Sequence, residues 1–139
     1  MLKFVSSTEV YTRKVAREFA KALQGGEKIC LIGPLGAGKT TFVRGFVAAF
    51  GISGDEVMSP TFTLIREYGS HKKVYHVDLY RIDNEEEIFE AGIFDLISGD
   101  QLVVIEWADR LDKYFPKDCI VIRFSHGEQG LRIIDMEGR

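Results

Sequence analysis

The amino-acid sequence predicts an α/β fold: one domain over residues 1–139 with a mixed, mostly parallel central sheet, helices on both faces and an antiparallel C-terminal hairpin. The first observation is the stretch GPLGAGKT at 33–40, which matches the phosphate-loop pattern. The second is its context, because the apolar run 28–32 precedes it and apolar residues at helical spacing follow it. The third is a pair of strand-like runs, 117–125 and 131–136, joined by a short turn. Together they indicate a single P-loop NTPase domain.

The residue types of the phosphate loop indicate its chemistry. Glycines let the backbone wrap closely around a phosphate, and the exposed N–H groups of the loop and the following helix suit an anion. Lys39 would bring a positive charge to the outer phosphates, and Thr40 would offer a hydroxyl to a magnesium ion. The alternative is a glycine-rich turn without a ligand, against which the lysine, the threonine and the flanking strand and helix all argue.

Composition and charge narrow the class of protein. Hydrophobic residues make up 45% and charged residues 28%, as in ordinary globular domains. The net charge of −3 argues against nucleic-acid binding by bulk electrostatics, although it does not exclude RNA held by a partner. Cys30 and Cys119 each lie in an apolar run and are expected to be buried thiols of a reducing compartment. No signal-peptide core and no apolar run of membrane-spanning length stands in the sequence, so we expect a cytoplasmic protein without membrane contact.

The N-terminal part is expected to form a short strand at 4–5 and then a helix. Ser6 and Glu9 stand at capping-box spacing, and an apolar face runs from there to the glycines at 25–26. Core packing explains that face. Because the helix starts two elements before the phosphate loop, residues 6–8, Thr8 among them, are also candidates to lie near a nucleotide base.

The segment SPTFT at 59–63 follows the helix after the phosphate loop, which is expected to stop at Gly51. Pro60 forces an extended approach to a strand at 64–68. In phosphate-loop hydrolases a threonine on such a loop often senses the terminal phosphate and the metal, which makes Thr61 a candidate. The alternative, of equal weight, is a residue at a strand edge.

A turn at 69–72 and a strand at 73–80 complete an expected hairpin. Asp78 in this apolar and aromatic strand is costly unless it is paired or hydrated. It either forms a salt bridge with a neighbour such as Arg81 or aims at the catalytic water or the metal. His76 on the same face is expected to be a satisfied structural histidine.

Short helices are expected on both sides of the last parallel strand. Asp83 stands where it would cap an acidic helix at 84–91, and residues 93–97 form another helical turn or two. Residues 109–115 (DRLDKYF) also read as a short helix, which Pro116 stops.

The strand between these helices, 102–105, is fully apolar and ends in Glu106 and Trp107. At the carboxyl edge of a parallel sheet this acid would lie beside the phosphate loop, where it could hold magnesium together with Thr40. The alternative is a strand-end glutamate that faces solvent. Trp107 either packs against the core or forms a stacking surface beside the site.

The pattern as a whole favours an ATPase. The Asn-Lys-x-Asp guanine reader of ordinary GTPases is missing from the sequence, and the chain is too short for the lid and second pocket of a nucleotide kinase. One alternative is a nucleotide-dependent adaptor or switch that does not need hydrolysis. Another is a small-molecule kinase.

Four stretches resemble the TsaE family of bacterial ATPases, which act in the biosynthesis of threonylcarbamoyladenosine in tRNA. They are GAGKTTF at 36–42, SPTFTL at 59–64, HVDLYR at 76–81 and VIEWADRL at 104–111. The resemblance extends over essentially the whole chain. It implies a P-loop fold and weak ATP hydrolysis with Mg²⁺. It also implies action with TsaB and with TsaD, which performs the transfer, and contact with tRNA only through that complex. Alone, the chain is expected to be a monomer or a weak dimer.

The resemblance also implies roles for residues of this chain. The phosphates would be bound by Gly36, Ala37, Gly38, Lys39, Thr40 and Thr41, and magnesium by Thr40 and Glu106. The catalytic or switch set would be Lys39, Thr61, Asp78 and Glu106, and the base contacts would come from Thr8 and Arg132. Apart from the resemblance, an internal arginine finger is not assured: Arg66, Arg81, Arg110 and Arg132 are candidates, and a partner could supply one instead. The chain departs from the family at Pro34, where little effect is expected, and at Ala108 and Asp109, which puts in doubt a role for Asp109.

Overall fold

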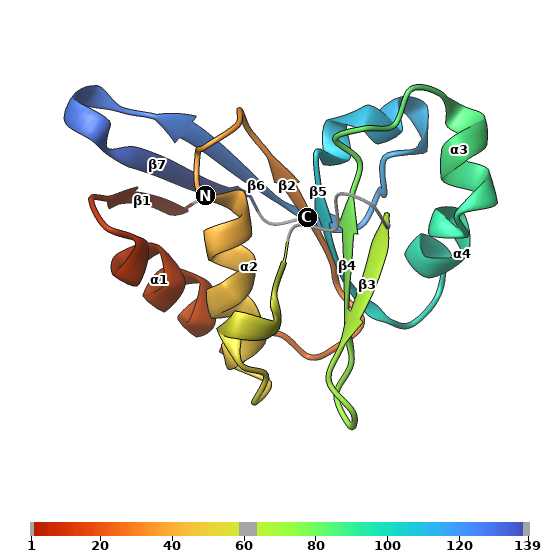
Figure 1. Cartoon of the computed structure of the whole chain (residues 1–139), viewed down its shortest axis with the longest axis horizontal. Coiled ribbons are helices and arrows are strands. Elements are labelled where there is room, and N and C mark those ends of the chain that lie inside the picture. Colours follow the sequence, from red (N-terminus) through yellow and green to blue (C-terminus); the bar gives the residue numbers. More distant parts are fainter. Residues whose placement is uncertain (1, 59–63, 138–139) are drawn as a thin grey trace.

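The computed structural model describes residues 2–58 and 64–137, and its centre is a seven-stranded sheet (Figure 1). In chain order the strands are β1 (Leu2–Ser6), β2 (Lys28–Ile32), β3 (Ile65–Tyr68), β4 (Val74–Asp78), β5 (Leu102–Glu106), β6 (Cys119–His126) and β7 (Arg132–Glu137). The α-helices are α1 (Glu9–Lys21), α2 (Lys39–Ala48), α3 (Glu85–Glu90) and α4 (Ile93–Ser98). Short 3₁₀ helices are η1 (Gly54–Glu56), η2 (Ala108–Tyr114) and η3 (Glu128–Gly130).

The sheet is mixed and mostly parallel, which confirms the predicted fold class. Its strand order is β1-β7-β6-β2-β5-β4-β3, and the four central strands β6, β2, β5 and β4 run parallel. The hairpins β3–β4 and β6–β7 are antiparallel, and β1 pairs antiparallel with β7 at the far edge. In the β4–β5 register Asp78 lies opposite Glu106, so two carboxylates end adjacent strands at one edge.

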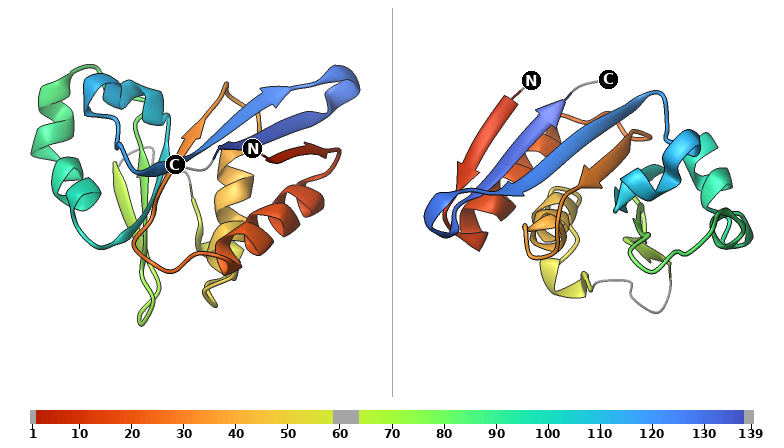
Figure 2. Two further views of the ribbon diagram at one scale, coloured as in Figure 1. Left: turned by 180° about the vertical axis from the view of Figure 1, so that it is seen from behind. Right: turned by 90° about the horizontal axis from the view of Figure 1, so that it is seen from above.

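Helices cover both faces of the sheet, as Figure 2 shows from behind and from above. Along β2, Ile29 and Leu31 face α1 and α2, where they pack with Phe42 in one buried cluster. Cys30 points to the other face and packs in a second cluster with Ile93 of α4. The alternation of side chains along a strand buried on both faces produces these two cores.

The two helices on the first face approach each other closely at Gly45 of α2. A Cβ atom at this position would lie 2.2 Å from the carbonyl oxygen of Arg13 in α1 and 2.5 Å from its Cα. A glycine lowers the stability of a helix interior, so its presence here is explained by this close packing. The contact fixes α2, whose N-terminus follows the phosphate loop.

Two predicted helix caps are wrong. The N-cap of α1 is Thr8, whose hydroxyl accepts from the Tyr11 N–H, whereas Ser6 is the last residue of β1. The N-cap of α3 is Asn84, not Asp83. The short helix predicted at 109–115 is present as the 3₁₀ helix η2 (Ala108–Tyr114), with a break at Asp112 (φ 50°). In the two cap regions neighbouring residues are all good caps, so spacing alone could not choose between them.

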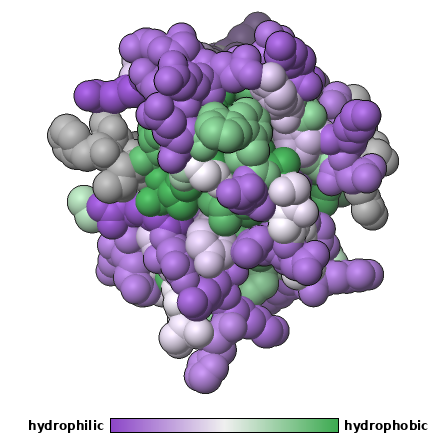
Figure 3. All heavy atoms as spheres, turned by 90° about the vertical axis from the view of Figure 1, so that its right-hand side faces the viewer, coloured by the Kyte–Doolittle hydropathy of each residue, from purple (hydrophilic) through white to green (hydrophobic). Residues whose placement is uncertain are grey.

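The α3–α4 side of the molecule carries apolar side chains within a polar surround (Figure 3). Phe89 and Tyr114 are exposed there, and Phe94 lies between them with ring centroids 6.3 Å and 4.8 Å away. None of the helices in the described part of the chain is long and apolar enough to cross a membrane.

Candidate active site

The predicted phosphate loop connects β2 to α2 and opens into a pocket of about 390 Å³. Gly38 caps α2 in the left-handed conformation (φ 102°), which favours glycine. Most of the predicted site residues line this pocket, and its lining comprises Glu9, Leu35, Gly36, Gly38, Lys39, Thr40, Thr41, Leu64, Asp78, Tyr80, Arg81, Glu106, Trp107 and Arg132. Ala37 is buried in the loop itself. The fold therefore brings together residues from six distant segments.

The side chain of Lys39, the first residue of α2, folds back onto the phosphate loop. Its Nζ donates to the carbonyl oxygens of Gly33 (2.6 Å) and Pro34 (2.7 Å) and lies 4.2 Å from the centroid of the Trp107 ring. Burial lowers the pKa of Lys39, and the nearby Glu106 carboxylate acts in the opposite direction. The ammonium group is thus fixed at the pocket, where the charge of a phosphate would be favourable.

Thr40 and Glu106 form a pair of oxygen donors beside the loop. The Thr40 hydroxyl donates to Glu106, with distances of 3.2 Å to Oε1 and 3.4 Å to Oε2. Glu106 is 3% exposed, so the alternative of a solvent-facing glutamate is wrong. A hydroxyl and a carboxylate fit Mg²⁺, which in nucleotide sites takes one or two protein ligands together with phosphate oxygens and water. Among the described residues there is no group of three or more His, Cys, Asp and Glu side chains that could hold a metal.

His76 contacts the same carboxylate from the neighbouring strand. Its Nε2 lies 2.6 Å from Glu106 Oε2, and its Nδ1 lies 3.0 Å from the Tyr68 hydroxyl. The prediction of a satisfied structural histidine is confirmed, but the identity of its partner was missed. The one signal in the sequence that linked His76 to the site was the period of two, which places His76 on the same face of β4 as Asp78.

Asp78 at the end of β4 and Arg132 at the start of β7 both line the pocket. Asp78 is buried, and its Oδ1 accepts from the backbone N–H of Tyr80 at 2.9 Å. Arg132, the first residue of β7, donates from Nε to the carbonyl oxygen of Gly36 at 2.9 Å. The C-terminal hairpin is thereby joined to the phosphate loop, and the contact of Arg132 with a nucleotide base stays a prediction.

Two further predicted site residues are not among the described residues that line the pocket. Thr61 lies outside the described residues, so its role stays a prediction. Thr8 caps α1 and is adjacent to Glu9, which lines the pocket; its contact with a base also stays a prediction. Of the predicted arginines, Arg81 lines the pocket, whereas Arg110 donates to the Ile82 carbonyl oxygen.

Trp107 has an unusual backbone. It adopts the left-handed conformation (φ 58°, ψ 39°), which is strained for a bulky residue. This turn directs the indole over Lys39 and against Tyr80, whose ring centroid is 5.0 Å away. Trp107 is partly buried against the second core cluster and also lines the pocket, so both predicted placements are observed.

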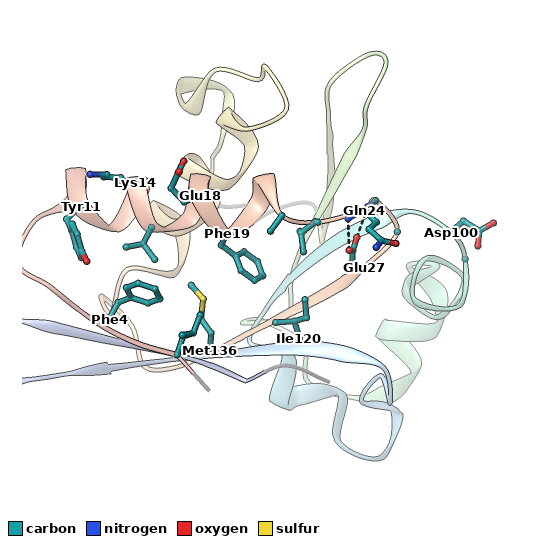
Figure 4. A pocket seen from close by; sticks show the side chains of 17 residues that line it. Phe4, Tyr11, Lys14, Glu18, Phe19, Gln24, Glu27, Asp100, Ile120 and Met136 are labelled. Carbon is teal, nitrogen blue, oxygen red and sulfur yellow. Dashed lines mark hydrogen bonds between the residues drawn. The ribbon is translucent and has the colours of Figure 1, made fainter.

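A larger hollow of about 1130 Å³ lies between α1 and the sheet (Figure 4). Among the residues that line it, Lys14 is the one cation, whereas Glu18, Glu27 and Asp100 are acidic. The Glu27 carboxylate accepts from the backbone N–H groups of Gln24 (2.8 Å) and Gly25 (2.7 Å). This lining would repel phosphates, so we assign nucleotide chemistry to the smaller pocket despite its size.

Comparisons with known proteins point to one family. The family model "Threonylcarbamoyl adenosine biosynthesis protein TsaE" matches residues 6–134. Curated relatives named "tRNA threonylcarbamoyladenosine biosynthesis protein TsaE" include one from Rickettsia bellii, 34% identical over 97% of this chain and 89% of the relative. Another, from Aquifex aeolicus, is 40% identical over 85% and 81%. A crystal structure of Bacillus subtilis YdiB superposes with a TM-score of 0.73 at 29% identity, covering 96% of this chain and 82% of that chain.

Proposed function

Because this chain belongs to the TsaE family, we propose that it is a magnesium-dependent ATPase that acts in the biosynthesis of threonylcarbamoyladenosine in tRNA. The single observation that carries the proposal is the pair formed by Thr40 and the buried Glu106 at the end of the phosphate loop. A carboxylate is costly to bury unless it is paired, and a hydroxyl beside a carboxylate supplies the oxygen ligands that a phosphate-bound magnesium ion would take.

The residues of the chain would mainly position and stabilise charge. The loop amides and Lys39 would bind the β- and γ-phosphates of ATP, and the indole of Trp107 would keep the lysine ammonium in place. When bound, magnesium would neutralise negative charge on the phosphates. Asp78, or Thr61 from outside the described residues, would orient the attacking water, and Arg81 of the pocket lining would stabilise the charge that develops on the phosphates.

The family role implies partners. We infer that the chain acts in the cytoplasm with TsaB and TsaD, that TsaD performs the transfer, and that tRNA is reached only through this complex. The net charge of −3 supports indirect contact, since a protein that binds RNA by itself gains affinity from positive charge.

The only tryptophan of the chain, Trp107, lines the pocket and can report nucleotide binding. We expect ATP to change its fluorescence saturably, Mg²⁺ to tighten ATP binding, and GTP to bind more weakly. Lys39→Ala should abolish tight binding, and Lys72→Ala, in an exposed turn, should not. Unaltered fluorescence and no heat of binding by calorimetry at millimolar ATP would contradict the proposal.

A further inference from the structure

A buried row of polar side chains crosses three strands of the sheet and ends at the site. Tyr68 of β3, His76 of β4 and Glu106 of β5 are 5%, 0% and 3% exposed. The distances are 3.0 Å from the Tyr68 hydroxyl to His76 Nδ1 and 2.6 Å from His76 Nε2 to Glu106 Oε2. Polar groups at such burial are costly unless each finds a partner.

The strand register shows that these contacts are diagonal. His76 lies opposite Val104, and its partner Glu106 is two residues further along β5. Tyr68 lies opposite Val74, and its partner His76 is two residues further along β4. Side chains must lean along the strands to meet. Both ring nitrogens of His76 are used, one on each side, and this holds the imidazole in one orientation.

The contacts fix which nitrogen carries a proton. Opposite an ionised Glu106, Nε2 must be the donor, because two acceptors 2.6 Å apart would repel. In the neutral ring, Nδ1 then accepts from the Tyr68 hydroxyl. Oε2 of Glu106 is therefore held by His76, and Oε1 is the carboxylate oxygen nearer to Thr40.

We propose that His76 is a positioning residue: Tyr68 orients its ring, and its Nε2–H holds the Glu106 carboxylate so that the other oxygen is presented to the magnesium ion. The inference rests on the proposed function, since it assigns His76 a role toward that ion. Groups that orient a metal-binding side chain commonly change metal affinity about 10–100-fold when removed.

Three variants separate positioning from simple packing. His76→Leu fills similar space without a donor, and His76→Gln restores an N–H near the position of Nε2. Tyr68→Phe removes only the hydroxyl that orients the ring. Tyr75→Phe and His71→Gln are the matched controls, because Tyr75 lies on the other face of β4 and His71 is exposed in a turn.

The experiment follows Mg²⁺ dependence of ADP binding by Trp107 fluorescence. We expect His76→Leu to weaken the apparent Mg²⁺ affinity about 10–100-fold, with metal-free ADP binding within about twofold of wild type and partial recovery in His76→Gln. Tyr68→Phe should have a smaller effect in the same direction. Wild-type Mg²⁺ dependence in folded His76→Leu and Tyr68→Phe overturns the inference. If wild type itself shows no Mg²⁺ effect, the proposed function fails instead.

Long-range ¹H–¹⁵N spectra of the metal-free, nucleotide-free wild-type protein give a second readout, which does not depend on how His76→Leu folds. The chain has three histidines, so the His76 signals are identified with His71→Gln and one further deletion, His126→Gln. We expect a proton on Nε2 of His76, and Tyr68→Phe should shift the Nδ1 signal. A neutral ring with its proton on Nδ1 alone contradicts the positioning role.

Discussion

Replacing Glu106 by glutamine removes one charge from the site while keeping the shape of the side chain. The amide oxygen can still accept from His76 Nε2, and the amide nitrogen can donate to the Thr40 hydroxyl, so both present contacts have neutral equivalents. The fold should therefore survive, and the effect should appear in binding of magnesium with nucleotide.

The size of the effect follows from burial and charge. Hydrogen bonds to charged groups contribute about 1.5–3 kcal/mol to stability, and neutral hydrogen bonds contribute about 0.5–1.5 kcal/mol, so the substitution weakens the two contacts. This loss is partly offset because a neutral glutamine side chain costs less to bury than an ionised carboxylate. We therefore expect the free energy of unfolding of Glu106→Gln to change by about 1 kcal/mol. Loss of a directly binding carboxylate should cost at least the 10–100-fold seen for outer partners, or about 1.4–2.8 kcal/mol.

The assay is an ATP titration monitored by Trp107 fluorescence, with EDTA and with increasing Mg²⁺. In Glu106→Gln, Mg²⁺ should no longer tighten ATP binding, whereas metal-free ATP binding should be equal or tighter because one negative charge near the phosphates is gone. Glu137→Gln, at the surface of β7, removes the same charge far from the pocket and should behave as wild type. If Glu106→Gln keeps the full Mg²⁺ effect, the metal assignment is refuted.

Three further predictions concern stability, ATP binding and thiol reactivity. Gly45→Ala should lower the free energy of unfolding by about 1–3 kcal/mol in urea titrations, although alanine is the better helix former, because the methyl group would meet the Arg13 backbone at 2.2 Å. Trp107→Phe should weaken ATP binding measured by calorimetry about 2- to 5-fold, since a smaller ring gives a weaker cation–π contact of ~0.5–1 kcal/mol with the lysine ammonium. Burial raises the pKa of the Cys30 and Cys119 thiols in the folded protein above the ordinary value of about 9.0. Their contribution to the free energy of unfolding is therefore fully present below about pH 9.0. It is lost as the pH rises through the raised folded-state pKa, because the unfolded chain gives up these protons more readily. A thiol reagent at pH 8 should therefore modify neither cysteine in the folded protein and both in urea, and rapid modification of the folded protein would contradict this burial.

Local patterns predicted the centre of the molecule correctly. The β2–loop–α2 unit was predictable because glycine pattern, apolar run and helical spacing all lie within about twenty residues. The approach of Glu106 to Thr40 was also predictable, since the carboxyl ends of parallel strands gather at one edge.

Features set by long-range register were not predictable. The partners of His76 depend on how β3, β4 and β5 align, and a diagonal contact leaves no periodic signal in the sequence. The pairing of β1 with β7 joins the two ends of the chain. The left-handed backbone of Trp107 is imposed by its surroundings, because nothing in a tryptophan favours that conformation.

The central claim is that ATP is hydrolysed at the phosphate loop with magnesium. Its most direct test is phosphate release from ATP by the chain together with TsaB and TsaD, with wild type and Lys39→Ala measured side by side. We predict Mg²⁺-dependent phosphate release by wild type that EDTA and Lys39→Ala both abolish. Equal release by Lys39→Ala, or ATP binding without release in any combination of partners, would contradict the claim, and the second result would favour a nucleotide-dependent adaptor.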